Sequence, residues 1–396
     1  MGLHQHRPEP SALFSWPGVR SLAAAVIGVA LALGGSGVTA QSLETSAREA
    51  ILIDMSTGTI LLDHNADARM PTASMSKIMT MYMVFEAIAQ GRLSLDDRLP
   101  VSERAWRKGG SKMFVEVGDQ VRVEDLIRGV IVQSGNDASI VFAEALAGTE
   151  EAFARLMTER AHELGLVSSN FANATGWPDP SHYSTAEDLS LLAQHLINDF
   201  PQFYHYYSQL EFTYNDITQA NRNPLLYQNV GADGLKTGHT SEAGYGLTAS
   251  AIQGDRRLVM VINGLPSARA RSEEAVRLIN WGFREFETRT LFEAGEVVDV
   301  AEVWLGSQET VPLVLAEDLA ITVRRTDADG VDLRLRVSEP MPAPLSAGQV
   351  VATLVVDIPG LPEREVPLLA GATIDRQGFA GRVMSQARQL VINALR

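Results

Sequence analysis

Hydrophobic and polar residues follow two different periods in the first part of the chain. Residues 50–63 form two apolar runs on either side of Ser56-Thr57-Gly58, which predicts two strands joined by a turn. Residues 71–90 place apolar side chains on nearly every side of a helix, and such a helix is buried in a core. Gly91 is positioned to end that helix. The start of the helix, at residues 74–77, offers backbone amides and a helix dipole that favour negative charge.

A mainly helical segment separates this hairpin from a second group of strands. Within residues 121–200 the clearest helical runs are 123–131, 150–164 and 186–197. Strands are then predicted at 234–239, 244–252 and 257–263, and a helix at 274–286. Strands at both ends of a helical middle indicate one antiparallel sheet built from distant segments and packed against helices, which is an α+β fold.

The pattern changes after residue 289. Apolar and polar residues alternate over 331–337, and further strands are predicted at 350–358 and 366–369 between several prolines. Residues 290–375 therefore predict a small all-β domain. Residues 376–396 place apolar side chains on one side of a helix and four arginines among the polar ones, which predicts an amphipathic helix lying at a membrane surface. Docking of this helix on its own domain or on a partner is the alternative.

The N-terminus has the layout of a secretory signal peptide. Arg7 and Arg20 precede the apolar run 22–33, and Val38-Thr39-Ala40 offers small residues for cleavage. The apolar run is short for a membrane span. Residues 1–40 are therefore predicted to be a signal peptide of an exported protein, with an uncleaved N-terminal anchor as the alternative.

The composition narrows the class of function. The chain of 396 residues has a formal net charge of −15, so a general electrostatic attraction to nucleic acid is excluded and no nucleic-acid partner is expected. The chain contains no cysteine, which excludes disulfides, thiol catalysis and zinc-thiolate sites.

Ser74 and Lys77 stand three residues apart and therefore share one face of the predicted helix. A serine hydroxyl needs a nearby base, and a lysine amine can act as one only where burial or a neighbouring charge lowers its pKa. The chain has only four lysines: Lys77, Lys108, Lys112 and Lys236. Among these only Lys77 has a serine three positions before it. Two further motifs follow, Ser134-Gly135-Asn136 and Lys236-Thr237-Gly238, and this ordered set is typical of class A β-lactamases and penicillin-binding proteins.

Together with the residues around them, these motifs resemble the low-molecular-mass penicillin-binding proteins, specifically the D-alanyl-D-alanine carboxypeptidases of the peptidase S11 type. The resemblance covers nearly everything after residue 40, and its longest runs are Gln133-Ser134-Gly135-Asn136-Asp137-Ala138, Tyr183-Ser184-Thr185-Ala186, Asn221-Arg222-Asn223 and Asp233-Gly234-Leu235-Lys236-Thr237-Gly238-His239-Thr240. It implies a β-lactamase/transpeptidase-like catalytic domain over residues 41–289, the all-β domain over 290–375 and a membrane-anchoring amphipathic helix over 376–396. The enzyme would lie peripherally on the periplasmic side of the cytoplasmic (inner) membrane.

The resemblance also implies the reaction. Ser74 would attack the carbonyl between the two terminal D-alanines of a peptidoglycan stem pentapeptide and form an acyl-enzyme. β-Lactam antibiotics such as penicillin would acylate the same serine. Lys77 would be the general base, and Ser134 would relay a proton toward the departing D-alanine.

By the same resemblance, the remaining motif residues bind the substrate. Asn136 would hold the substrate amide, and the charge of Lys236 would keep Ser134 ready to accept a proton. Thr237 would bind the terminal carboxylate with Arg222.

Three further positions complete the predicted site. Gly238 lets the strand approach the ligand closely. The backbone amides of Ser74 and His239 would form the oxyanion hole. Arg271 would assist Arg222, with an ordinary surface arginine as the alternative, since the chain holds many arginines.

Two other functions use the same motifs. A serine β-lactamase shares the acylation step, but the E-x-x-L-N element of class A enzymes does not occur between Asn136 and Lys236. A non-catalytic peptidoglycan-binding scaffold is the other alternative, and the intact Ser74, Lys77 and Lys236 argue against it. The sequence shows no H-E-x-x-H or similar cluster, so neither a metal nor a cofactor is expected.

Overall fold

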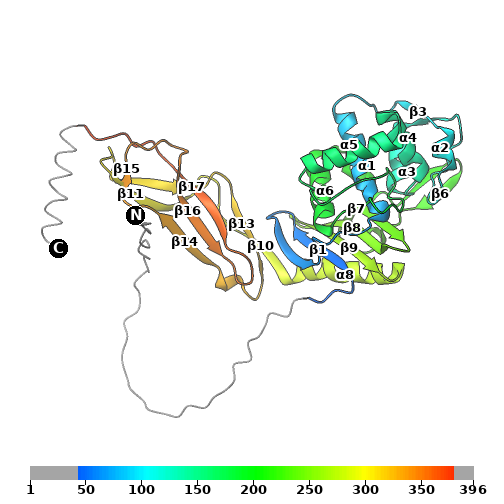
Figure 1. The fold of residues 1–396 in the computed structure, drawn as a ribbon. Helices are drawn as coiled ribbons and strands as arrows, with labels where there is room; N and C mark the ends of the chain where they lie inside the picture. Colours follow the sequence, from blue (N-terminus) through cyan, green and yellow to red (C-terminus); the bar gives the residue numbers. More distant parts are fainter. Residues whose placement is uncertain (1–42, 379–396) are drawn as a thin grey trace, which may run out of the picture. The chain divides into compact units, whose positions relative to one another are not determined.

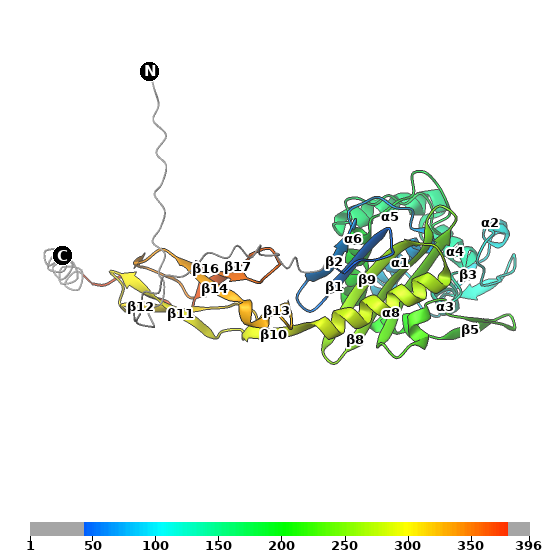
Figure 2. The ribbon, with the colours of Figure 1, turned by 90° about the horizontal axis from the view of Figure 1, so that it is seen from below.

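The computed structural model describes residues 43–378 (Figures 1 and 2). The predicted signal peptide, residues 1–40, lies outside the described residues, as does most of the predicted anchor helix. Of that helix, only residues 376–378 are described, and they are not helical. Arg376 instead forms a β-bridge with Gly306, and the amide of Gln377 donates to the carbonyl of Leu305 at 2.8 Å.

A five-stranded antiparallel sheet, in the order β2-β1-β9-β8-β7, forms the centre of the N-terminal domain. The predicted hairpin supplies β1 (Glu49–Asp54) and β2 (Thr59–His64), and the later strands are β7 (Ala232–Thr240), β8 (Gly244–Gln253) and β9 (Arg256–Leu265). β1 pairs with β9 along its whole length, with Ile51 opposite Val261. The prediction of one sheet built from distant chain segments is confirmed.

Successive side chains of each central strand belong to two different cores. Ile51 and Val261 pack with the helical middle of the chain, whereas Leu52 and Met260 pack in a second cluster together with α8 (Ala268–Glu285). Figure 2 shows α8 running along the sheet. Burial on both faces fixes the register of these strands, because a slip by one residue would exchange the two sets.

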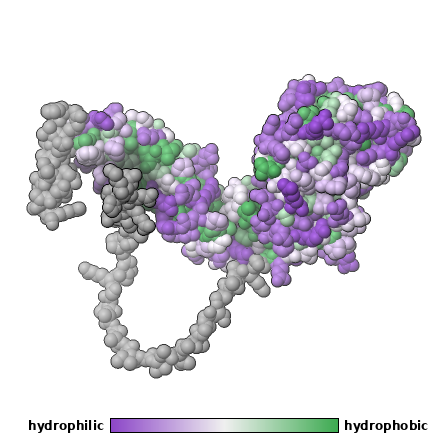
Figure 3. Space-filling view, in the orientation of Figure 1, coloured by the Kyte–Doolittle hydropathy of each residue, from purple (hydrophilic) through white to green (hydrophobic). Residues whose placement is uncertain are grey.

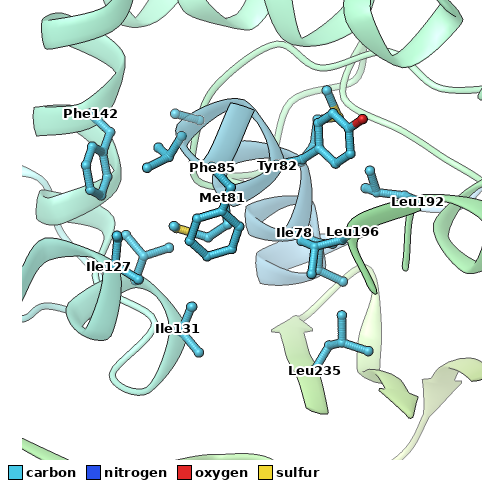
Figure 4. Packing of buried hydrophobic residues seen from close by; sticks show 14 of the residues in the cluster. Ile78, Met81, Tyr82, Phe85, Ile127, Ile131, Phe142, Leu192, Leu196 and Leu235 are labelled. Carbon is cyan, nitrogen blue, oxygen red and sulfur yellow. The ribbon is translucent and has the colours of Figure 1, made fainter. Parts of the chain in front are cut away.

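The helix α1 (Lys77–Ala89) is surrounded by apolar side chains, as its sequence predicts. Figure 4 shows Ile78, Met81, Tyr82 and Phe85 of this helix within the cluster. The 3₁₀ turn Ala73–Ser76 precedes α1, and Gly91, with a φ of 69°, follows its end.

The other helices of this domain are α2 (Glu103–Arg107), α3 (Val123–Ile131), α4 (Asn136–Ala147), α5 (Glu150–Glu163), α6 (Ala186–Asp199) and α7 (Pro201–Tyr204). Two short two-stranded sheets accompany them: β3 (Arg98–Pro100) with β4 (Gln120–Arg122), and β5 (Glu211–Tyr214) with β6 (Ile217–Ala220).

The C-terminal part is all-β, as predicted, and has its own apolar core. A six-stranded sheet has the order β14-β16-β17-β12-β11-β15, and β10 pairs separately with β13. These strands are β10 (Phe286–Phe292), β11 (Val297–Trp304), β12 (Thr310–Val314), β13 (Leu319–Arg324), β14 (Asp332–Val337), β15 (Met341–Pro342), β16 (Val350–Asp357) and β17 (Arg364–Ala370). The face of the molecule in Figure 3 is largely hydrophilic, because most apolar side chains lie inside these cores.

Two helix starts differ clearly from the prediction. α1 begins at Lys77 and not at residue 71, because residues Ala73–Ser76 form a 3₁₀ turn, so Ser74 precedes the helix. α8 begins at Ala268, six residues before the predicted start at Glu274. Its first turn is set by Ser267, whose side chain accepts a hydrogen bond from the amide of Ala270, and not by an apolar stripe. The fully buried apolar side chains of α8 begin at Ala275, which is why the hydrophobic pattern alone missed the first turns.

Candidate active site

Ser74 lies in the 3₁₀ turn that leads into α1, with its side chain partly accessible. Lys77, at the first position of α1, lies fully buried, and its Nζ is 3.0 Å from Ser74 Oγ. The structure therefore brings together the two residues that the i, i+3 spacing predicted on one face.

Three oxygen atoms surround the Lys77 amine. Besides Ser74 Oγ, it donates to Asn136 Oδ1 at 2.8 Å and to the carbonyl of Thr175 at 2.6 Å. Burial, followed by the nearby charge of Arg222, lowers the pKa of Lys77 to about 7. The Asn136 amide oxygen and the Thr175 carbonyl oxygen can only accept hydrogen bonds. When the Lys77 amine is neutral, the Ser74 hydroxyl is therefore the one group of the three that can donate to its lone pair. This geometry allows the neutral Lys77 amine to accept the proton of the Ser74 hydroxyl.

The second motif forms the turn between α3 and α4. Ser134 is buried in the left-handed backbone region, with a φ of 61°, and its Oγ has no hydrogen-bond partner within the described residues. The neighbouring carboxylate of Asp137 accepts hydrogen bonds from the amides of Met113 and Phe114, at 2.9 Å and 3.0 Å. Asn136 donates through Nδ2 to the carbonyl of Gly109 at 2.8 Å. This turn is thus fastened to the loop of residues 109–114.

The third motif lies on β7, at the edge of the sheet. Gly238 is needed there, because an added Cβ would lie 2.7 Å from the carbonyl oxygen of Thr72. Thr72 begins the segment of residues 72–76 that carries Ser74, which we call the nucleophile turn. Lys236 is buried, and its Nζ donates to the carbonyl of Thr237 at 3.2 Å. Burial, followed by the nearby charges of Lys77 and Arg222, lowers the pKa of Lys236 well below its usual value. This direction runs against the permanently charged Lys236 expected from the sequence, and no hydrogen bond joins it to Ser134 within residues 43–378.

Two arginines complete a cleft of about 450 Å³ over Ser74. Arg222 donates to Ser111 Oγ at 2.5 Å, and Arg271, on α8, is only 8% exposed. Neither arginine forms an ion pair within the part of the chain that the structure describes. The cleft is lined by Ser74, Ser111, Ser134, Arg222, Thr237, Gly238, His239, Tyr245 and Arg271. A cleft with two unpaired guanidinium groups suits a ligand carboxylate.

Of the ten predicted site residues, seven line this cleft, and Lys77, Asn136 and Lys236 lie buried beneath it. The imidazole of His239 stacks on Tyr245, with ring centroids 3.9 Å apart. Arg271 belongs to the cleft and is not the surface arginine that was the alternative. Ser111 and Tyr245 were not predicted, since neither stands in a recognised motif.

The segment of residues 172–182 packs on the turn that carries Ser74 and was not predicted to belong to the site. Its Thr175 supplies a main-chain carbonyl to Lys77 and so has no side-chain signature. Gly176 has a φ of 75°, and an added Cβ would lie 1.7 Å from the carbonyl oxygen of Ala73. No side chain fits between this segment and the turn that carries Ser74.

His182, in the same segment, forms a second contact with the nucleophile turn, through Ser76. Its Nδ1 accepts from the amide of Ala172 at 3.2 Å, so its Nε2 carries the proton and donates to Ser76 Oγ at 2.6 Å. The Ser76 hydroxyl then lies 2.5 Å from Thr72 Oγ1, at the start of the nucleophile turn. Burial lowers the pKa of His182 to about 4, which keeps the imidazole neutral at physiological pH. A neutral His182 thus holds both ends of the turn that presents Ser74.

Within residues 43–378 no group of three or more histidine, aspartate or glutamate side chains is arranged to hold a metal ion. None of the helices in this described part is long and apolar enough to cross a membrane.

A reactive serine, a buried lysine base and a cationic cleft define a serine acyl-transfer enzyme of the penicillin-binding type. The chain belongs to the peptidase S11 family of D-alanyl-D-alanine carboxypeptidases, whose family model matches residues 36–266. Residues 286–376 match the C-terminal domain of penicillin-binding protein 5.

Related proteins cover nearly the whole chain. It is 40% identical to the D-alanyl-D-alanine carboxypeptidase DacC of Escherichia coli, over 87% of this chain and 88% of that protein. The crystal structure of penicillin-binding protein 5 from Haemophilus influenzae superposes with a TM-score of 0.77 at 37% identity, covering 84% of this chain and 99% of that one. Penicillin-binding protein D2 from Listeria monocytogenes, solved in its ampicillin-bound form, has a TM-score of 0.56 at 32% identity and covers 61% of this chain and 99% of its own.

The lowered pKa of Lys77 predicts the pH dependence of acylation. Because the base must be neutral, the second-order rate constant for acylation by benzylpenicillin should be constant at high pH and fall with an apparent pKa of about 7 as the pH drops. Stopped-flow acylation between pH 5.5 and 9 measures this. His182→Gln is the control and should keep the same acid limb, which separates Lys77 from the nearby imidazole. A rate that stays flat down to pH 5.5 would contradict the assignment of the base.

The His182 hydrogen bond predicts a matched pair of variants. His182→Ala leaves the buried Ser76 hydroxyl without its donor, which costs about 1–3 kcal/mol, and we expect acylation of Ser74 to slow by about tenfold. His182→Gln keeps an amide N–H donor and should recover most of the rate. Both rates are measured at pH 8, with melting temperatures as the check on folding. Equal losses in the two variants would mean that the hydrogen bond does not position the turn.

Proposed function

We propose that this protein is a serine-type D-Ala-D-Ala carboxypeptidase that removes the terminal D-alanine from peptidoglycan pentapeptides. The observation that carries the proposal is the buried Lys77 amine 3.0 Å from Ser74 Oγ, with a pKa of about 7. DacC, named above, is a D-alanyl-D-alanine carboxypeptidase, and penicillin-binding protein D2 was solved in its ampicillin-bound form. We further propose that β-lactams acylate the same serine.

Acylation begins with transfer of the Ser74 proton to the neutral Lys77 amine. Ser74 Oγ then forms a bond to the carbonyl carbon of the penultimate D-alanine, and the negative charge on its oxygen is stabilised by the backbone amides of Ser74 and His239. The terminal carboxylate lies against Thr237 and the two arginines. When the C–N bond breaks, Ser134 passes its proton to the departing amine and is reprotonated from the Lys77 ammonium, which becomes neutral again. Lys77 then takes a proton from a water molecule as the water oxygen attacks the ester carbonyl. It passes this proton to Ser74 Oγ when the ester bond breaks, which restores the free serine.

Substitution of the nucleophile tests this proposal. Ser74→Ala should abolish both release of D-alanine from a pentapeptide and covalent labelling by benzylpenicillin, because within residues 43–378 Ser74 supplies the one hydroxyl that is hydrogen-bonded to the Lys77 amine. Release is measured with a D-amino-acid oxidase assay, and mass spectrometry locates the penicilloyl group. Ser111→Ala, which removes a cleft hydroxyl that contacts Arg222, is the matched control and should still be labelled at Ser74. Undiminished D-alanine release by Ser74→Ala would show that the proposed nucleophile is wrong.

We also propose the division of the chain and its location. Residues 1–40 are a signal peptide, 41–289 the catalytic domain, 290–375 the β-domain and 376–396 a region that anchors the enzyme to the periplasmic side of the cytoplasmic membrane. The charge of the C-terminal end supports the membrane anchor, since the last 21 residues contain four arginines in a chain of net charge −15. A role in cell-wall maintenance and cell shape follows from this location and substrate.

Truncation of the tail tests the membrane proposal. A chain ending at Gly378 should move from the membrane fraction to the soluble periplasmic fraction and keep its reaction with penicillin. A full-length variant with Arg382, Arg388 and Arg396 changed to Gln separates the charge of the tail from its apolar side chains, and should be released at lower salt than the natural chain. Retention of the truncated chain in the membrane fraction would contradict the assignment.

A further inference from the structure

The loop of residues 106–112 combines features that the proposed reaction does not use. The chain has four lysines; Lys77 and Lys236 are in the catalytic centre, and the other two, Lys108 and Lys112, both lie in this short loop. The same loop supplies Ser111, which lines the cleft beside Ser74. The lysines outside the catalytic centre are therefore gathered at its rim.

Each of these lysines lies beside an exposed tryptophan. Lys108 Nζ is 5.0 Å from the ring centroid of Trp177, and Lys112 Nζ is 5.9 Å from that of Trp106. The two tryptophans are 44% and 39% exposed, whereas burial is usual for a side chain of this size. Neither ammonium forms an ion pair among residues 43–378, although the chain contains 48 aspartates and glutamates.

The two loops that carry these residues contact each other next to the cleft. The Trp177 ring lies against Gly110, where an added Cβ would be 3.1 Å from it. Gly109 accepts a hydrogen bond from Asn136, and Arg222 donates to Ser111. Lys108 and Trp177 are thus continuous with the substrate cleft on its Ser111 side. We call Trp106, Lys108, Lys112 and Trp177 the rim site.

The chemistry of the rim site suits an anionic glycopeptide. An exposed indole offers an apolar face on which a sugar ring or an aliphatic chain can pack, and the adjacent ammonium attracts a carboxylate. A peptidoglycan stem carries further carboxylates and a muramyl sugar on the amino side of its D-Ala-D-Ala end. In an acidic protein, two unpaired cations at the cleft entrance also concentrate an anionic substrate there.

We propose that the rim site binds the distal part of the stem, the carboxylates and sugar that precede D-Ala-D-Ala. This rests on the proposed carboxypeptidase function and adds to it a second point of recognition. Binding remote from the reacting bond lowers the KM for the natural glycopeptide relative to a short peptide that ends in the same two residues.

Two substrates separate the rim site from the catalytic centre. The first is N-acetylmuramyl pentapeptide, and the second is diacetyl-Lys-D-Ala-D-Ala, which has neither the sugar nor any carboxylate besides the terminal one. We expect Lys108→Gln/Lys112→Gln to reduce kcat/KM for the glycopeptide about tenfold, mainly through KM, and to leave the short peptide and acylation by benzylpenicillin within twofold. The difference between the natural protein and the variant should shrink as the salt concentration rises. Trp177→Ala should show the same selectivity.

Arg92→Gln/Arg155→Gln is the matched control, because it removes two exposed positive charges elsewhere in the domain and should leave both substrates unaffected. Lys108 also contributes to the lowered pKa of Lys77, so an equal loss on both substrates would mean that the lysines act through the base, and would overturn the proposal. Unchanged kinetics on the glycopeptide would overturn it as well. If the natural protein cleaves neither substrate, the proposed function itself fails, which is a separate result.

Discussion

The active site depends on one costly interaction, the burial of the Lys77 amine at the first position of an apolar helix. An ammonium group in such a place is unfavourable unless oxygen atoms surround it or the proton leaves. Both conditions are partly met in the structure. Three oxygens lie within 3.0 Å of Lys77 Nζ, and the pKa of Lys77 falls to about 7, so that part of the population is neutral near pH 7. Only one of those oxygens has a proton to give. The environment that penalises the charge of Lys77 is therefore the same one that aims its lone pair at Ser74.

Holding those three oxygens in place requires segments that are far apart in sequence. Asn136 lies 59 residues from Lys77, and Thr175 lies 98 residues from it. Each segment is held by contacts that leave no room for adjustment. The Asp137 carboxylate fixes the Ser134–Asn136 turn to loop amides, and Gly176 packs its backbone directly on the nucleophile turn. Gly238 does the same from the sheet edge. The two glycines are thus part of the catalytic geometry, although neither supplies a functional group.

These contacts also explain which parts of the site could be predicted from the sequence. Ser74, Lys77, Ser134, Asn136 and the Lys236–Gly238 strand carry their chemistry in side chains at recognisable spacings, and the structure gathers them all at one place. The Thr175 carbonyl could not be predicted in this way, because any residue supplies one. His182 lacked a signal too, since its partner Ser76 occupies an unspecified position of the Ser74–Lys77 motif.

The fold shows the same division between strong and weak signals. The buried helix α1 and the paired strands β1 and β9 were predictable, because burial on several sides leaves a long apolar pattern. The β5–β6 hairpin and the first turns of α8 were not predicted. β5 and β6 are only four residues long each, so the alternation in β5 is too short to stand out, and the start of α8 is set by a local hydrogen bond to Ser267. Arg271 shows a further limit: in a chain rich in arginine, only its position on α8 and its burial distinguish it from a surface residue.

Charge then links the base to the choice of substrate. Lys77, Lys236, Arg222 and Arg271 lie in or beneath one cleft, and the charge of Arg222 adds to burial in lowering the pKa of both lysines. Lys77 and Arg271 lower the pKa of Lys236 further. A substrate carboxylate beside Thr237, on the same strand as Lys236, would raise the pKa of Lys236, since an opposite charge favours the protonated form of an amine. It would thereby favour the charge expected of Lys236 from the sequence. A scissile bond with no carboxylate beside it would leave the cations of this cleft uncompensated. The charges of the cleft thus favour a substrate whose scissile bond lies next to a free carboxylate, as the last peptide bond of a chain does.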